Sequence, residues 1–180
     1  MGTAEQTVEV VDLTETTIRE LNQRLHDAAD GGPQNWRITH PNGVHAIGAG
    51  INAPLEIDID GHVGYYCAGM NKEANIRIHG SAGVGLAENI MSGTVIVDGD
   101  TSQSAAATGR GGLLVVRGNA AARCGISMKG VNIVVEGNVG HLSAFMAQKG
   151  ALVVCGDAGE ALGDSIYETH IYVRGSVAEL

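Results

Sequence analysis

Seven glycines recur at intervals of 19 residues along this chain, and this spacing constrains the fold more than any other feature. The interval never varies across Gly61, Gly80, Gly99, Gly118, Gly137, Gly156 and Gly175. The residues two and four positions before each glycine are always Ile, Val or Leu. Alternate aliphatic residues that end at a glycine are typical of a short strand with one buried face. The sequence therefore predicts one short strand in every repeat.

The length of the repeat predicts how these strands connect. A unit of 19 residues is too short for a strand–helix–strand crossover, and it contains no amphipathic helical half. It does not divide into three similar sixes, as a left-handed hexapeptide helix would require. We therefore expect an all-β fold, a right-handed parallel β-helix of about seven turns, since parallel crossovers are nearly always right-handed. At ~4.8 Å per turn, seven turns would stand roughly 30 Å tall.

The N-terminal 33 residues precede the repeat and predict an extension (1–33) with a short helix. Thr17 and Glu20 resemble a capping box, and Gly31 follows the stretch as a stop signal. One helical face between them is apolar: Ile18, Leu21, Leu25 and Ala28. We expect this helix to cap the open N-terminal end of a β-helix domain that spans residues 34–180.

A degenerate first turn is expected over residues 34–52. Counting back 19 residues from Gly61 reaches Asn42, which tolerates the left-handed backbone that glycine favours. The same count places Ile38 four residues before the anchor and Ala49 seven residues after it. Small residues also recur three and seven positions after each later glycine, where we expect tight corners.

One outward-facing column predicts a contact surface. The residues three before each glycine begin with Asp58 and Arg77 and then become apolar: Ile96, Val115, Val134, Val153 and Tyr172. Stacked apolar side chains on an outer face usually mark an interface, so we interpret this stripe as a partner interface. The alternative is that the chain's own N-terminal segment covers it. The column immediately before each glycine is polar, which indicates a solvated face.

Composition and charge narrow the function classes. The formal net charge is −9, and no basic stripe that could neutralise nucleic-acid phosphates is visible. No stretch approaches the ~20 apolar residues that span a bilayer, and the N-terminus lacks the pattern of a secretory signal. We therefore expect a cytoplasmic protein that binds neither nucleic acid nor membrane, with its three cysteines reduced.

The chain shows no arrangement that predicts catalysis or metal binding. Cys67 and Cys124 fall in one column three turns apart, about 14 Å on the ladder spacing, and Cys155 falls in another column. The seven histidines show no metal-motif spacing. The glycine-rich run Gly80–Gly85 lacks the following helix that a dinucleotide fingerprint needs. We expect no catalytic residue, cofactor or metal in this chain.

The glycine pattern resembles a known family. Gly80–Gly85, Asn138–Gly140 and Gly156–Gly159 are similar to the GXGXG motif of the β-helix domain at the C-terminus of the large glutamate synthase subunit. Asn42–Gly50 resembles the entry to that domain, and Gly156–Gly175 resembles its free-standing version. The resemblance covers about residues 35–180 and is more specific for the fold than for the complex.

The resemblance implies a structural role. In glutamate synthases this domain holds the amidotransferase and synthase domains in register, and it contains no nucleophile, flavin or iron–sulfur ligand. A free-standing version implies a non-catalytic subunit that docks a class II glutamine amidotransferase-like subunit and an FMN-binding glutamate synthase-like subunit. FMN and an iron–sulfur cluster are then expected in a partner. N-methylglutamate synthase is the specific complex that we favour.

Two other functions remain open from the sequence. The same module occurs as one of the subunits of formylmethanofuran dehydrogenase, where it is a scaffold in a different enzyme. An independent β-helix enzyme acting on carbohydrate would need a cleft of carboxylates with aromatic platforms for sugars. The single Trp36 and the pair Tyr65–Tyr66 lie toward one end of the chain, which disfavours that alternative.

Overall fold

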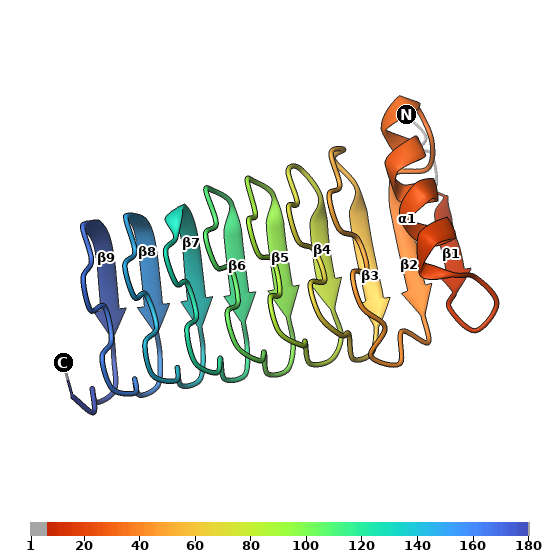
Figure 1. The fold of residues 1–180 in the computed structure, drawn as a ribbon. Coiled ribbons are helices and arrows are strands. Elements are labelled where there is room, and N and C mark those ends of the chain that lie inside the picture. The colour runs from red at the N-terminus through yellow and green to blue at the C-terminus, as the bar shows by residue number, and fades with distance from the viewer. Residues whose placement is uncertain (1–6, 180) are drawn as a thin grey trace, which may run out of the picture.

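The computed structural model describes residues 7–179 and places their strands in one parallel sheet. Each strand pairs only with its neighbours in sequence, so the sheet grows by one strand per turn (Figure 1). The elements of this region are β1 (Val8–Asp12), α1 (Ile18–Asp27), the 3-10 helix η1 (Ala28–Asp30), β2 (Asn35–Thr39), β3 (Glu56–Asp60), β4 (Asn75–Ile78), β5 (Thr94–Val97), β6 (Leu113–Val116), β7 (Lys129–Val135), β8 (Lys149–Val154) and β9 (Glu168–Val173).

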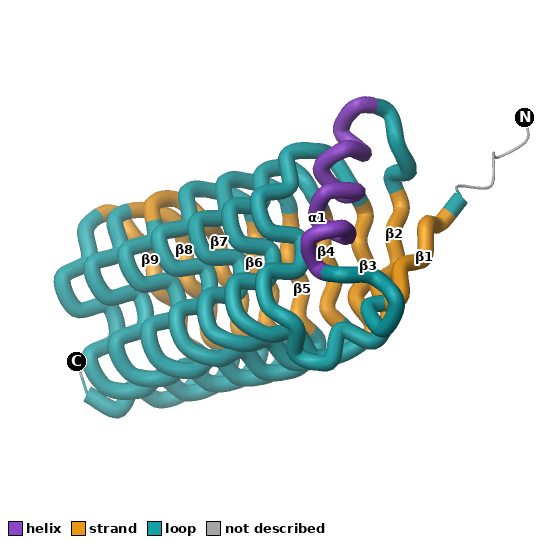
Figure 2. The backbone as a smooth tube through the Cα atoms, turned by 45° about the vertical axis from the view of Figure 1, so that its right-hand side comes forward, coloured by secondary structure: helices purple, strands orange, loops and turns teal. Residues whose placement is uncertain are grey.

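The turns stack as a right-handed parallel β-helix, as the repeat predicts. Figure 2 shows the strands on one side of the coil and the connecting loops on the other. From β3 onward each strand pairs with the next at an offset of 19 residues, for example Ile57 with Ile76 and Ile76 with Val95. A second parallel ladder of isolated bridges links the corners, from Val63 through Ala82 to Val177. Every regular turn is therefore fixed at two places.

The core is a stack of aliphatic side chains. The two predicted inward columns are at most 2 % exposed from β3 to β8. In the last turn Ile171 and Val173 are only half-buried, because no further turn lies beneath them. Burial of aliphatic side chains at ~25 cal/mol per Å² supplies the main driving force for stacking the turns.

The anchor glycines form one file along the coil, but not for the conformational reason that the sequence suggested. Among the seven, only Gly61 has a left-handed backbone, with φ of 137°. The next glycines stack directly, with the Gly99 N–H donating to Gly80 O at 2.8 Å and the Gly118 N–H donating to Gly99 O at 3.1 Å. A Cβ on Gly80 would lie 2.5 Å from the Gly61 carbonyl carbon. Close stacking of turns, rather than positive φ, requires glycine here.

Left-handed backbone occurs instead in the loop half of each turn. Gly85, Ala87 and Asn89 have φ values of 72°, 52° and 58°, and the equivalent residues of other turns match them. The N–H groups of Gly85 and Asn89 donate to the following turn, whereas that of Ala87 donates to the preceding turn, each at 2.9 Å. The alternation links each loop to both neighbours. These ladder bonds offset the ~1–2 kcal/mol that a non-glycine residue costs in this conformation.

The first turn departs from the expected register by two residues. Strand β2 pairs with β3 at an offset of 21 residues, so Ile38 aligns with Ile59 and Trp36 aligns with Ile57. The prediction that Ile38 lies in the column of Ile57 is therefore wrong, and Trp36, expected outside the turns, is 3 % exposed in the core. Between the aligned Thr39–Asp60 and Val44–Val63 positions, the first turn has two extra residues at the corner.

The N-terminal segment adds a strand that the sequence analysis did not anticipate. Strand β1 pairs in parallel with β2, so the sheet begins inside the predicted extension 1–33. Helix α1 has the expected capping box, in which the Glu20 N–H donates to Thr17 Oγ1 at 3.3 Å, and Gly31 follows η1 with φ of 107°. Leu21 and Leu25 are fully buried. The helix connects β1 to β2 on the loop side of the coil (Figures 1 and 2).

Helix α1 closes the loop edge of the first turn by hydrogen bonding. The Asn22 side chain donates to Ala46 O at 2.8 Å and accepts from the Gly48 N–H at 2.9 Å. In later turns the equivalent N–H groups donate to the turn before. The Asn22 amide thus replaces a peptide group of the missing preceding turn, and the prediction of a capping helix is confirmed with a defined contact.

Candidate interaction surfaces

The predicted stripe lies in one column of the strand face. Parallel pairing aligns its members in order, Ile96 with Val115, Val115 with Val134, Val134 with Val153 and Val153 with Tyr172. The first four side chains are half-buried by their neighbours, and Tyr172 is 58 % exposed. Residues 7–33 pack against β2 and the 44–50 loop, away from this column. A partner for the stripe remains a prediction.

A cluster of charges adjoins the stripe on β3 to β6. Asp98 accepts hydrogen bonds from Arg77 at 3.2 Å and from His79 Nδ1 at 3.0 Å, and Arg117 lies 3.1 Å away. The other His79 nitrogen lies 2.7 Å from Asp58. Partial burial would raise the pKa of Asp98, but the bonds from Arg77 and His79 outweigh it and lower the pKa. Every charge here has a partner of opposite sign, which indicates a structural network.

A polar ladder follows the glycine file. The Asn119 N–H donates to Asp100 Oδ1 at 2.6 Å, the Asn138 N–H to Asn119 Oδ1 at 2.9 Å and the Asp157 N–H to Asn138 Oδ1 at 2.7 Å. The sequence analysis identified this column only as turn-forming. Each side-chain oxygen accepts from the backbone of the next turn, so the column contributes to the order of the stack.

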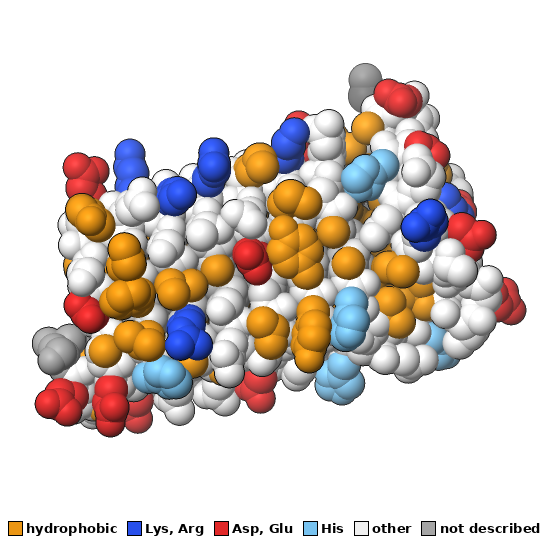
Figure 3. All heavy atoms as spheres, in the orientation of Figure 1, with side chains coloured by type: hydrophobic (Ala, Val, Ile, Leu, Met, Phe, Trp, Pro, Cys, Tyr) orange, Lys and Arg blue, Asp and Glu red, His pale blue; other side chains and the backbone are white. Residues whose placement is uncertain are grey.

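The loop face presents a second apolar surface, which sequence reasoning missed. Figure 3 shows hydrophobic side chains gathered on this face, with Lys and Arg along one edge. Its exposed apolar side chains include Tyr65, Met70, Val84, Met91 and Met146, which are 39–57 % exposed. The fixed 19-residue register could have revealed it, because these residues recur four, nine and eleven positions after the anchors. Their outward direction depends on the left-handed loop backbone, which the sequence did not predict.

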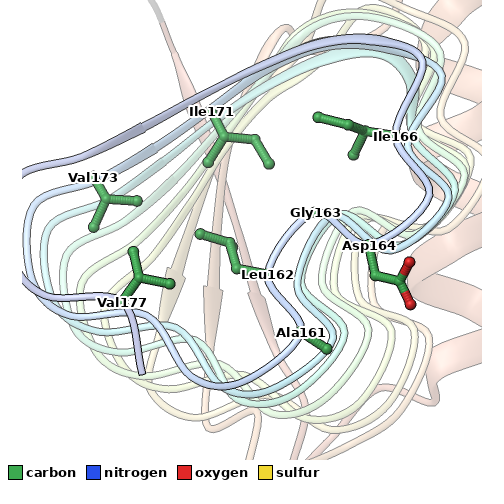
Figure 4. A pocket seen from close by; sticks show the side chains of 8 residues that line it. All are labelled: Ala161, Leu162, Gly163, Asp164, Ile166, Ile171, Val173 and Val177. Carbon is green, nitrogen blue, oxygen red and sulfur yellow. The ribbon is translucent and has the colours of Figure 1, made fainter. Parts of the chain in front are cut away.

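The C-terminal end of the coil is hollow. A cavity of about 810 Å³ opens there and is lined by Ala161, Leu162, Gly163, Asp164, Ile166, Ile171, Val173 and Val177. Figure 4 shows the apolar side chains of this set pointing into the coil, whereas Asp164 points away. The cavity is the continuation of the core past the last turn. It presents aliphatic surface without a converging set of polar groups.

The cysteines lie where the register places them. Cys67 and Cys124 are fully buried, and Cys155 is half-buried on the strand face. Burial raises the pKa of each buried thiol to about 12. Within residues 7–179, no group of three or more His, Cys, Asp and Glu side chains is arranged to hold a metal ion. In the same part of the chain, no helix has the length and apolarity to span a membrane. The run Gly80–Gly85 continues into turns rather than a helix.

The fold and these surfaces define a parallel β-helix protein whose exposed features are a stripe, an apolar loop face and an open end. Among curated proteins, the chain is similar to Protein GlxC of Rhizobium meliloti (strain 1021), with 58 % identity over 89 residues. The aligned segment covers 49 % of this chain and 39 % of that relative, so the chain matches less than half of the relative's length. No family model matches the chain. No solved structure matches it either.

Proposed function

We propose that this chain is a non-catalytic scaffold subunit of a glutamate synthase-like complex. It docks a class II glutamine amidotransferase-like subunit and an FMN-binding synthase-like subunit, and N-methylglutamate synthase is the complex that we favour. The observation that supports this proposal most directly is the continuous column of outward apolar side chains from Ile96 to Tyr172 on a rigid sheet.

Two further points support the proposal. The glycine-rich corners resemble the GXGXG domain of glutamate synthases, and the similarity to Protein GlxC is consistent with a subunit of this kind. The proposal assigns FMN and the iron–sulfur cluster to a partner. The regular stack of turns then gives that partner and the amidotransferase subunit fixed positions relative to one another. Ammonia transfer between two active sites requires such fixed positions.

The stripe can be tested by a single charge. We expect Val134→Asp to leave the chain folded, since the side chain points outward and is only half-buried. A carboxylate in the centre of an apolar interface must be desolvated without a partner, so the complex should fail to assemble. The measurement is co-elution of this chain with flavin absorbance after co-expression with the two partner subunits, alongside circular dichroism of the isolated variant.

Val84→Asp is the matched control, because Val84 is 39 % exposed on the loop face. It should retain the flavin-containing complex. If Val84→Asp abolishes assembly and Val134→Asp does not, the docking surface lies on the loop face and the proposed stripe is wrong. If Val134→Asp unfolds the isolated chain, the stripe is part of the packed structure instead.

A further inference from the structure

The two ends of the coil are unlike, which bears on what can cover the open one. At the N-terminal end, β1 places Glu9 in the inward column opposite Trp36, and Arg24 of α1 forms an ion pair with Glu9. Stacking a second copy head to tail would bury this pair against Ile171, at a large desolvation cost. Helix α1 also occupies the loop side of this end. The N-terminal end is therefore closed to a further turn.

The C-terminal end presents an unpaired strand edge. The N–H of Glu168 donates to Gln148 O and that of Arg174 to Val154 O, both at 2.9 Å, so these groups point toward β8. Because backbone groups alternate along a strand, Thr169, Ile171 and Val173 direct their N–H and C=O groups away from β8. An open edge of this length beside an aliphatic cavity is a template for pairing with another strand.

The sequence of β9 and the next residue is complementary to itself in the antiparallel direction. If Ile171 lies opposite Ile171 of a second copy, Glu168 lies opposite Arg174, His170 opposite Tyr172, and Thr169 opposite Val173. In this register the outward face gains two pairs of opposite charge and two aromatic pairs. The three residues with free backbone groups face one another across the junction. A two-fold axis requires this self-complementarity, since each contact must occur twice.

We propose that two copies of this chain join at their open ends by antiparallel pairing of β9 with β9 of the second copy, centred on Ile171. The pairing continues the sheet through both molecules and brings the two aliphatic ends together over Ile171 and Val173. The outward faces of both copies then lie on the same side of one continuous sheet. This inference concerns the isolated chain and does not depend on the proposed scaffold role.

The charge pairs allow a reciprocal test. Analytical ultracentrifugation of the full chain should give twice its 18.5 kDa mass. Glu168→Arg places like charges opposite each other twice, and we expect the dissociation constant to rise about tenfold or more. The double variant Glu168→Arg with Arg174→Glu restores opposite charges and should restore the dimer. A wild-type monomer, or a double variant as weak as the single one, would overturn the proposal.

A cysteine at the symmetry centre tests the register itself. In a Cys155→Ser background, Ile171→Cys places two thiols opposite each other, where Cα atoms lie about 5.5 Å apart, within disulfide range. We expect a disulfide-linked dimer on mild oxidation. Tyr167→Cys, at an exposed position on the same end, is the control and should remain largely unlinked. If the two variants cross-link equally, or only Tyr167→Cys does, the proposed pairing is incorrect.

Discussion

Single residues in this fold are constrained by the turn above and the turn below more than by their neighbours in sequence. The anchor glycines show this most clearly, because a side chain there meets the backbone of the preceding turn. A Cβ on Gly118 would lie 2.8 Å from the carbonyl carbon of Gly99. The periodic glycines were visible in the sequence, but their physical cause was not, since it depends on the spacing between turns.

Gly118→Ala should therefore destabilise the coil by overpacking, by about 3 kcal/mol. Gly43→Ala provides a contrast, since a Cβ there meets no atom within 4 Å but φ is 73°. Backbone strain alone should cost about 1 kcal/mol at that position. Urea denaturation of both variants measures the difference. A loss at Gly118 no larger than the loss at Gly43 would contradict the role of close stacking.

The buried thiols give a prediction that depends on pH. The pKa values of Cys67 and Cys124 are raised to about 12 by burial, above the ~8.5 of an unfolded thiol. The folded state therefore keeps its protons longer than the unfolded state does. This contribution to stability is fully present below about pH 8.5 and is lost as the pH rises toward 12.

Thiol titration with a disulfide reagent at about pH 8 provides the measurement. In the native protein Cys155 should react, while Cys67 and Cys124 react only after denaturation. Wild-type urea midpoints should fall above about pH 9 more steeply than those of a Cys67→Ala, Cys124→Ala variant. Equal pH dependence in the two proteins would show that the buried thiols do not contribute.

Secondary-structure elements were predictable where the repeat fixes them and less so where it does not. Strands β3 to β9 follow from the 19-residue register, because two aliphatic residues and a glycine mark each one. Helix α1 follows from its capping box. Strand β1 lies outside the repeat, and its residues Val8–Asp12 become a strand only through pairing with β2. The first turn was misplaced because its corner contains two extra residues, which no local signal marks.

The contact between α1 and the first turn is the element-scale feature most open to test. Asn22→Ala removes one donor and one acceptor from partly buried backbone groups of the 46–48 loop. The expected loss of stability is about 1–3 kcal/mol, because Ala46 O and the Gly48 N–H lose their partner. Asn22→Asp should lose less, since it can still accept from Gly48.

Gln23→Ala is the control on the same helix, since its side chain bonds only to exposed Asp27. It should change stability by less than about 0.5 kcal/mol. Hydrogen exchange at Gly48 adds a local measurement, and faster exchange is expected in Asn22→Ala. Unchanged exchange and stability would mean that the helix covers the edge without hydrogen bonding to it.

At the scale of the whole molecule, the sequence predicted the architecture and one of its surfaces. The stripe from Ile96 to Tyr172 was predictable because outward columns follow from the strand register. The apolar loop face was not, because residues such as Met70 and Met146 point outward only through a left-handed backbone. The difference between the two ends was also hidden, since it depends on Glu9, Arg24 and α1 meeting in space.

The constant length of the regular turns has a consequence for how such a scaffold can vary. From β3 to β9 every turn spans 19 residues and repeats the same contacts. Insertion or removal of one whole lap in the middle leaves the helix at one end and the open edge at the other unchanged. Binding sites near opposite ends would then move apart or together in steps of about 4.8 Å. The coil thus acts as a spacer whose length is set by counting laps, with no redesign of its extremities.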